Sequence, residues 1–360
     1  MEFKIRSILF ILSNCLIAMF RAVRLNAVTY PVEPAERAEL ERAGCQFIAI
    51  EGQRPDEIVD SATDCDALLV VSAYVPASII ERLSNCQVIS RLGAGTDRID
   101  IDAATRCGIV VANVPDFCVD EQAEHTMALL LAMARRLPWM TAAMRRFDWT
   151  ARHDPGVHRV AGRTLGLIGF GAGAKAVAER ARGFGLRLHA WARTPDRHRA
   201  DADRLGVKLV GLDSLLEQSD FVSIHLPLTP QTRHLIGAGR LARMKPTAVL
   251  INTARGAIFD ENALVEALRE RRIAGAAIDV FDGIDVFALP GTPARHPLME
   301  LDNVILTPHC AGSSVESTLD SKIRGARNAA AVLTGKWPAS VVNPGVRPRH
   351  PLSIHGSQES

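Results

Sequence analysis

Short apolar runs alternate with amphipathic segments along most of this chain. Apolar runs bounded by turn residues predict buried strands, and apolar positions spaced three and four apart predict helices. In the first part of the chain we expect strands at 25–30, 46–50, 67–72, 87–92 and 109–113, and helices at 34–43, 55–62, 76–83 and 101–106. Such alternation is typical of an open parallel sheet with helices on both faces.

A second α/β run follows a long predicted helix at about 120–137. It should contain strands at 164–168, 187–191, 208–210, 221–226, 248–252, 275–281 and 303–307, and helices at 175–181, 212–218, 239–244, 261–271 and 314–334. The predicted fold class is therefore α/β with two Rossmann-like or flavodoxin-like parallel-sheet lobes, the second inserted into a discontinuous first. We expect the first lobe at 22–118 and 312–345, the second at 119–311, an N-terminal extension at 1–21 and a disordered tail at 346–360. A ligand belongs at the carboxyl ends of the strands.

A glycine-rich turn joins the strand at 164–168 to the helix after it. Gly169 permits the turn, Gly171 lets the backbone approach phosphates, and Ala174 lets helix and strand pack closely. The helix N-terminus offers free N–H groups to an anion. A structural turn is the alternative, but the strand at 187–191 follows at the distance that a dinucleotide-binding βαβ unit requires. The predicted cofactor-binding residues of the turn are Gly169, Gly171, Ala172, Gly173 and Ala174.

The amino-acid composition mainly argues against certain partners and sites. The 360 residues are 48% hydrophobic and 23% charged with a formal net charge of +2, which is ordinary for a globular protein and implies no nucleic-acid partner. Seven cysteines are scattered without a CxxC pair. This pattern fits reduced thiols better than a disulfide framework or a zinc site, so the sequence predicts no metal.

The first residues resemble the apolar region of a secretory signal, because the run at 7–20 follows Lys4 and Arg6. The run is shorter than the roughly 20 apolar residues that span a bilayer. We interpret it as an over-long start, with Met19 as a plausible beginning, and expect a cytoplasmic protein without membrane contact.

Three polar side chains stand at or just past strands of the second lobe. Arg255 can grip a carboxylate with two hydrogen bonds and polarise a neighbouring carbonyl. Asp279 lies in an apolar strand and needs partners there. His309 suits proton transfer because its ordinary pKa is near neutrality. Each alone could be a surface ion pair, a cap partner or a turn histidine, but together at strand ends they predict a catalytic site.

A larger set of motifs resembles the D-2-hydroxyacid dehydrogenases, in the family's order and over roughly 22–345. The motifs are Arg91-Leu-Gly-Ala-Gly-Thr-Asp97, Gly108-Ile-Val-Val-Ala-Asn113, Ala123-Glu-His125, the glycine turn, His225-Leu-Pro-Leu-Thr-Pro-Gln-Thr232, Asn252-Thr-Ala-Arg-Gly256, Gly275-Ala-Ala-Ile-Asp-Val280 and Thr307-Pro-His309. The wording at Val88-Ile-Ser-Arg-Leu-Gly93 and Pro115-Asp-Phe-Cys118 is most similar to the C-terminal-binding-protein-like branch.

The resemblance implies a role for each matching position. The first lobe would be the substrate domain and the second the NAD(P)-binding domain. His309 would be the acid/base on the C2 oxygen, and Arg255 would hold the substrate carboxylate together with backbone amides at Ala94 and Gly95. Asp279 would orient the nicotinamide carboxamide. The cofactor would also be lined by Pro227, Thr232, Thr253 and Ala254.

Two positions depart from the family pattern. The family's carboxylate partner of the histidine is usually a Glu, and its place here holds Ile284. Asp285 is the nearest substitute and Asp282 the other, so we expect Asp285 to take the catalytic role. The second departure is at Ala192, where an acidic residue would bind the ribose hydroxyls of NAD. Arg193 follows it, which predicts that the pocket tolerates or prefers NADP(H) over NAD(H).

The sequence therefore predicts an NAD(P)-dependent oxidoreductase of small D-2-hydroxy or 2-keto acids. The alternative is an NAD(H)-sensing binding protein of the same fold with little turnover, which Ile284 favours. The aromatic residues Trp139, Phe147 and Trp149 stand in a mixed stretch at 139–153. We expect them to be exposed and to bury against a second copy in a homodimer, with ordinary packing on their own lobe as the alternative.

Overall fold

The computed structural model describes residues 20–52, 54–284 and 295–353. The chain is divided into two compact units. Residues 118–314 form the second unit, and the residues before and after them form the first. Each unit contains one sheet, and every strand pair in both sheets is parallel. The predicted fold class of two parallel-sheet lobes, one inserted into the other, is therefore confirmed.

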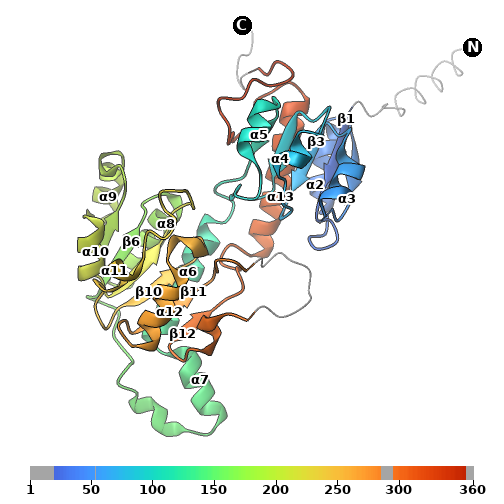
Figure 1. Cartoon of the computed structure of the whole chain (residues 1–360). Coiled ribbons are helices and arrows are strands. Elements are labelled where there is room, and N and C mark those ends of the chain that lie inside the picture. Colours follow the sequence, from blue (N-terminus) through green and yellow to red (C-terminus); the bar gives the residue numbers. More distant parts are fainter. Residues whose placement is uncertain (1–19, 53, 285–294, 354–360) are drawn as a thin grey trace, which may run out of the picture. The chain divides into compact units, whose positions relative to one another are not determined.

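The first unit has a five-stranded sheet in the order β2-β1-β3-β4-β5, which is the flavodoxin-like arrangement (Figure 1). Its elements are β1 (Phe20–Arg24), α2 (Pro34–Arg42), β2 (Cys45–Ala49), α3 (Pro55–Ala62), β3 (Ala67–Val70), α4 (Ala77–Ile80), β4 (Val88–Arg91), α5 (Ile101–Arg106), β5 (Val110–Ala112) and α13 (Val315–Leu333). One apolar core joins the sheet to α3, α4 and α5, and another joins it to α2 and α13. The sheet is thus covered on both faces.

The first strand lies earlier than predicted. We expected a strand at 25–30, but β1 spans Phe20–Arg24 and pairs with β2 and β3. A charged residue such as Arg24 is not expected inside a buried strand. Here the Arg24 side chain is fully buried and pairs with Glu36, with 3.0 Å between Nε and Oε1. A buried arginine is tolerated when it is paired and hydrogen-bonded. Phe20 and Arg21 therefore belong to the first unit rather than to an extension.

The end of the described chain also differs from prediction. We expected a disordered tail from residue 346, yet Val346 is buried and Arg349 donates to the carbonyls of Cys107 and Leu83 at 2.8 and 2.9 Å. Ser353 exchanges backbone hydrogen bonds with Trp337 and Gly335. Backbone and side-chain hydrogen bonds thus hold residues 346–353 on the first unit without any strand or helix pattern.

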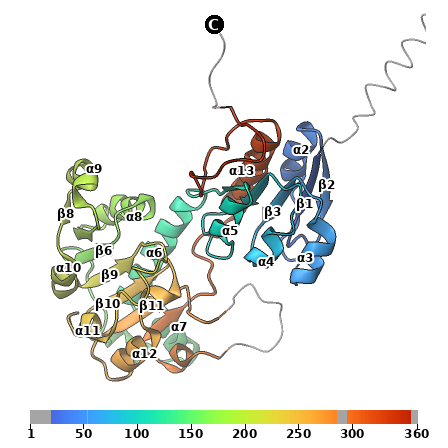
Figure 2. The same cartoon turned by 45° about the horizontal axis from the view of Figure 1, so that its top comes forward.

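The second unit has a seven-stranded sheet in the order β12-β11-β10-β9-β6-β7-β8 (Figures 1 and 2). The chain runs outward from β6 to β8 and then returns to the other side of β6 at β9, so the strand order reverses between β6 and β9. The strands are β6 (Thr164–Ile168), β7 (Arg187–Trp191), β8 (Val207–Leu209), β9 (Phe221–Ile224), β10 (Val249–Asn252), β11 (Gly275–Ile278) and β12 (Val304–Leu306).

Helices cover both faces of this sheet as well. One core contains apolar side chains from α6, α8 and α9, and the other contains those from α10, α11 and α12. These helices are α6 (Val119–Ala134), α8 (Ala172–Arg182), α9 (Arg199–Leu205), α10 (Leu212–Gln218), α11 (Ala238–Leu241) and α12 (Glu261–Arg269). None of the helices in the described ranges is both long and apolar enough to cross a membrane.

The stretch after α6 is more ordered than predicted. The expected helix at 120–137 ends at Ala134, because Arg136 adopts a left-handed conformation with φ 51°. A further helix, α7 (Leu137–Arg145), begins there with a proline in its first turn, and a 3-10 turn spans Trp149–His153. Trp139 was expected to be exposed, but it is partly buried, and its Nε1 donates to the carbonyl of Asp302 at 2.7 Å.

Candidate functional site

The glycine turn after β6 lies at the reversal point of the sheet. Gly169 has φ 97°, in the region that favours glycine. A Cβ at this position would be 2.3 Å from the backbone oxygen of His225, which follows the neighbouring strand β9. Only glycine therefore allows the two strand ends to approach so closely.

The space above this turn suits a phosphate group. A Cβ built on Gly171 would have no atom within 4 Å, so the surface beside it is open. Ala172 and Gly173 begin α8, whose first backbone N–H groups have no partner within the helix. Ala174 is fully buried in the core between α8 and the sheet. The five predicted phosphate-binding positions thus form one continuous cradle, and the residues present fit a dinucleotide.

Two histidines beside the cradle carry polar atoms that need partners. Within the described residues, Nδ1 of His225 and Nδ1 of His198 are buried and lack a hydrogen-bond partner. Nδ1 of His225 is 3.9 Å from the Cβ position of Gly173, and its Nε2 lies 2.9 Å from the Ser223 hydroxyl. Burial lowers the pKa of His225 to about 4, so its imidazole is neutral at pH 7. The edge contact of His198 with Phe170 keeps it near the same turn.

Arg193 lies just past the end of β7. The backbone N–H of Gly169 donates to Trp191 at 2.9 Å, so the end of β7 is held beside the turn. Arg193 is exposed, and neither it nor Arg197 forms an ion pair within the part of the chain that the structure describes. Both guanidinium groups are therefore available to an anion.

The loop after β10 carries Arg255 and is held from two sides. The Asn252 side chain accepts from the N–H of Ala254 and donates to the carbonyl of Arg255, both at 2.9 Å. From α6, Gln122 donates to the carbonyl of Thr253 at 2.9 Å. The Arg255 guanidinium donates to the carbonyl of Ala254 at 2.7 Å. The backbone at the predicted cofactor-lining positions Thr253 and Ala254 is thus rigidly placed.

The loops after β10 and β11 pack directly against each other. A Cβ on Gly256 would be 2.2 Å from the carbonyl carbon of Phe281 and 2.4 Å from the N of Asp282. Glu261 fixes the same segment, because its Oε1 accepts from the Asp282 N–H at 2.7 Å and its Oε2 lies 2.8 Å from Nε2 of His296. The loop that carries Arg255 and the segment after Asp279 are therefore held against each other.

The Asp279 carboxylate lies where β11 and β12 reach their carboxyl ends, a region that we call the β11–β12 edge. It is fully buried, and its Oδ1 accepts from the Thr307 hydroxyl at 2.5 Å and from the Cys310 N–H at 2.9 Å. Its Oδ2 accepts from the Ala311 N–H at 2.9 Å. These bonds stabilise a buried charge that would otherwise be costly.

His309 is locked onto this edge through its backbone. Its N–H donates to the carbonyl of Asp279 at 2.8 Å, and its φ is 56°. A left-handed conformation is costly for a side chain of this kind and persists only where the surroundings impose it, which is frequent at functional sites. The structure therefore brings His309 and Asp279 together at the carboxyl ends of adjacent strands.

The remaining predicted positions belong to two other loops. Thr232 donates through its hydroxyl to the carbonyl of Pro227 at 2.7 Å, so these two form a single turn after β9. Ala94 and Gly95 belong to the first unit. Their carbonyls accept from Asn113 at 2.8 Å and from Arg91 at 3.0 Å, respectively, which fixes the peptide planes of that loop.

The carboxylate partner of His309 stays a prediction. Ile284 is the last described residue before the gap at 285–294, so Asp285 lies outside the described residues. The carboxylate of Asp282, the other candidate, pairs with Arg233 at 3.5 Å and His234 at 3.7 Å.

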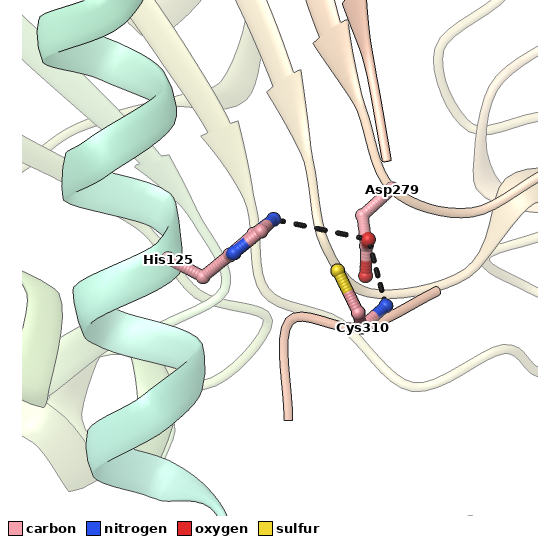
Figure 3. A group of neighbouring side chains, drawn as sticks. All are labelled: His125, Asp279 and Cys310. Atoms are coloured by element: carbon pink, nitrogen blue, oxygen red, sulfur yellow. Dashed lines mark hydrogen bonds and ion pairs between the residues drawn. The ribbon is translucent and has the colours of Figure 1, made fainter. Parts of the chain in front are cut away.

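Sequence reasoning assigned no role to several residues at this edge. His125 on α6 places its Nε2 3.1 Å from the Thr307 hydroxyl and 3.8 Å from Oδ1 of Asp279 (Figure 3). Cys310 follows His309, and burial, followed by the charge of Asp279, raises the pKa of its thiol. These contacts join three separate elements, so no spacing in the sequence could have revealed them.

A family model and the most similar relatives point to the same protein family. The family model described as "D-isomer specific 2-hydroxyacid dehydrogenase, NAD binding domain" matches residues 127–311. A D-3-phosphoglycerate dehydrogenase of Methanocaldococcus jannaschii is 38% identical over 318 residues, covering 88% of this chain and 59% of that protein. A glyoxylate reductase of Korarchaeum cryptofilum is 39% identical over 291 residues, covering 79% of this chain and 85% of that protein.

A solved structure agrees with these relatives. The NADPH-dependent glyoxylate/hydroxypyruvate reductase of Sinorhizobium meliloti superposes with a TM-score of 0.76 at 28% identity, covering 90% of this chain and 98% of that one. The predicted family and the predicted cofactor class, NAD(H) or NADP(H), are thereby confirmed. The finer branch assignment stays a prediction. The chain spans little more than half the length of the archaeal phosphoglycerate dehydrogenase.

Proposed function

The chain belongs to the D-isomer specific 2-hydroxyacid dehydrogenase family, and on that premise we propose that it interconverts a small 2-keto acid and its D-2-hydroxy acid. The proposal rests on one observation above all. Arg255 and His309 follow strands of one sheet, and both of their loops are fixed to the chain around Asp279. A guanidinium and an imidazole so placed can handle a carboxylate and a neighbouring carbonyl.

The second unit would hold the nicotinamide cofactor, which supplies the hydride when bound. The turn from Gly169 to Ala174 would hold the pyrophosphate, and the neutral His225 would offer its unpaired Nδ1 nearby. Pro227, Thr232, Thr253 and Ala254 would line the rest of the pocket. Asp279 would orient the carboxamide through whichever lone pairs its internal donors leave free.

Arg255 would bind the substrate carboxylate and polarise the adjacent carbonyl. Its guanidinium fork matches a carboxylate with two parallel hydrogen bonds. Backbone amides at Ala94 and Gly95 would bind the same carboxylate. The positive charge also stabilises the oxygen as negative charge develops on it, which is commonly the largest electrostatic contribution to such a reaction.

His309 would donate a proton to that oxygen during reduction and take it back during oxidation. A carboxylate beside the ring would stabilise the imidazolium, and Asp285 is the residue we propose for it. The ion pairs of Asp282 with Arg233 and His234 leave it less suited to this role.

We propose a homodimer, because Phe147 and Trp149 are 85% and 67% exposed beyond α7. We also propose that the first unit acts as the substrate domain, that the second unit, residues 118–314, acts as the cofactor domain, and that the protein is cytoplasmic. An NAD(H)-sensing protein with little turnover is the second candidate, and Ile284 in place of the usual glutamate is the feature that favours it.

A turnover assay distinguishes the two candidates. The purified chain should oxidise NADH or NADPH in the presence of glyoxylate, hydroxypyruvate, pyruvate or 3-phosphohydroxypyruvate. Binding of cofactor without consumption of any of these acids would support the sensing protein and contradict the proposed reaction.

Substitutions then test the two named residues. Loss of the proton donor in His309→Ala should lower kcat by about 10²–10⁴-fold. Loss of the guanidinium in Arg255→Ala should lower it by about 10²–10³-fold. Cofactor affinity, measured by fluorescence titration, should stay close to that of the wild type in both variants. An unchanged kcat in either variant would remove that residue from the mechanism.

A further inference from the structure

Three side chains that can bind metals meet at the β11–β12 edge. His125 comes from α6, Asp279 follows β11 and Cys310 follows β12 (Figure 3). One ligand atom from each residue lies within 4.8 Å of the other two. Asp279 is fully buried, whereas His125 and Cys310 are partly exposed, so an ion could reach the group.

This donor set matches the coordination chemistry of zinc. Zinc binds cysteine sulfur, histidine nitrogen and carboxylate oxygen at about 2.0–2.3 Å, which sets ligand atoms of a tetrahedral site about 3.3–3.8 Å apart. Nε2 of His125 and Oδ1 of Asp279 are already 3.8 Å apart. A soft thiolate favours zinc over magnesium or calcium. We propose that His125, Asp279 and Cys310 form an inhibitory site for a soft divalent cation such as Zn²⁺.

Binding requires a small change in protons and hydrogen bonds. The Thr307 hydroxyl donates to Asp279, so it accepts from Nε2–H of His125. An incoming ion takes the Nε2 lone pair, and the imidazole proton moves to Nδ1, which neutral histidine permits. The Cys310 thiol releases its proton to solvent. The ion then balances the charges of one carboxylate and one thiolate, while Asp279 keeps its bonds from the backbone.

An occupied site would prevent cofactor use. The same Asp279 carboxylate is the group that we propose for the nicotinamide carboxamide, and Cys310 adjoins His309 in the chain. Inhibition by the ion therefore rests on the proposed function, whereas metal binding itself rests only on the three side chains. The sequence predicts no metal here, since its cysteines have no CxxC spacing and the three ligands come from distant segments.

The experiment uses Co²⁺ as a visible probe for the full chain after treatment with a chelator. We expect one Co²⁺ per chain, with a thiolate-to-cobalt charge-transfer band that Zn²⁺ abolishes on displacement. Cys310→Ser should lose the band. His125→Gln should weaken Co²⁺ binding by at least roughly tenfold to a hundredfold, because that range applies to residues that only support a metal ligand, and His125 is itself a proposed ligand.

Two other partly exposed cysteines provide controls. Cys107→Ser removes a thiol of the first unit, and Cys118→Ser removes the thiol near Gly312. Both variants should keep the band. Absence of the band in the wild type, or its persistence in Cys310→Ser, would overturn the site. The spectrum decides this even if no keto acid is turned over, so the two proposals can fail separately.

Where turnover is measurable, a second readout applies. Micromolar Zn²⁺ should raise the KM for the cofactor in the wild type, and a chelator should restore it. In Cys310→Ser, the KM for the cofactor should be the same with and without Zn²⁺. Equal inhibition of the wild type and of Cys310→Ser would contradict the inhibitory role.

Discussion

We expect discrimination between the two cofactors to depend on the chain just past the end of β7. Ala192 offers no carboxylate to the ribose hydroxyls, and Arg193 and Arg197 carry unpaired positive charges within the described residues. A charge-assisted hydrogen bond to a 2′-phosphate contributes about 1.5–3 kcal/mol, or roughly tenfold to a hundredfold in affinity. Arg193→Ala should therefore weaken NADPH by this factor and leave NADH nearly unchanged, as measured by fluorescence titration.

Two variants control for charge and position. Arg193→Lys should retain part of the preference, and Arg187→Ala, at the opposite end of β7, should have no effect on either cofactor. A wild type that binds NADH far more tightly, with no change on substitution of Arg193, would show that this side chain does not contact the cofactor.

The neutral imidazole of His225 should make the stability of the fold depend on pH. Burial lowers its pKa from 6.5 to about 4 in the folded chain, whereas the unfolded chain keeps the ordinary value. Below pH 6.5 the unfolded state therefore binds more protons, and the stability contributed by neutral His225 is lost as the pH falls from 6.5 through about 4. Burial lowers the pKa of His189 too, so it adds to the same slope.

His225→Gln should reduce the loss of stability between pH 7 and pH 4. At 1.36 kcal/mol per pKa unit, discounted for the partial exposure of the residue, the difference should be of the order of 1–3 kcal/mol in the free energy of unfolding. Urea unfolding at several pH values measures it, with the exposed His153→Gln as control. Parallel pH profiles for the wild type and His225→Gln would contradict a buried neutral imidazole.

At the scale of elements, hydrophobic periodicity predicted most of the sheet strands because parallel strands are buried on both faces. Thr164–Ile168 and Arg187–Trp191 were predicted with their observed bounds. The misses have physical causes. Arg24 is a buried charge within a strand, and α9 is a short, highly charged helix that buries only Ala202 and Leu205.

The candidate site was only partly predictable for a different reason. Strand ends and glycine turns are local features, so Gly169, Arg255, Asp279 and His309 could be found from the sequence. Contacts across elements could not. The position of His125 opposite Asp279 depends on how α6 packs on the sheet, and no local pattern encodes that packing.

The packing of the β10 loop on the β11 loop can be tested at Gly256. Its missing Cβ lies only 2.2 Å from the carbonyl carbon of Phe281, so Gly256→Ala must push the two loops apart. We expect a loss of about 1–3 kcal/mol in the free energy of unfolding, the range for overpacking, and a lower kcat because Arg255 moves. Denaturant unfolding and a turnover assay measure the two effects.

Gly239→Ala is the matched control for this substitution. Gly239 lies in α11, and a Cβ there would meet no atom within 4 Å. Replacement of a helical glycine by alanine is neutral or slightly stabilising. Similar stability of Gly256→Ala and Gly239→Ala would contradict the tight contact between the loops.

At the scale of the whole molecule, the proposed homodimer rests on exposed apolar side chains on and after α7. Leu137 and Met144 on this helix are 53% and 42% exposed, and Phe147 and Trp149 follow it with greater exposure. Trp139, in contrast, packs on its own unit through Asp302 and Arg136. Large exposed apolar areas mark protein interfaces more often than free surfaces, so these four exposed side chains support the proposed homodimer.

The proposed homodimer should therefore depend on Phe147 and Trp149 and not on Trp139. Light scattering at micromolar concentration should give twice the mass of the chain for the wild type.

A double variant tests the two side chains. Asparagine tolerates the positive φ of 59° at position 147, so Phe147→Asn combined with Trp149→Ala should shift the protein toward the monomer without straining the backbone. Phe184→Ala removes a 45% exposed aromatic elsewhere on the second unit and should leave the dimer intact. Because the substitutions remove apolar contact area without disturbing the core, far-ultraviolet circular dichroism should be unchanged. A wild-type monomer, or a dimer that survives both substitutions, would mean that the surface around α7 serves another partner or none.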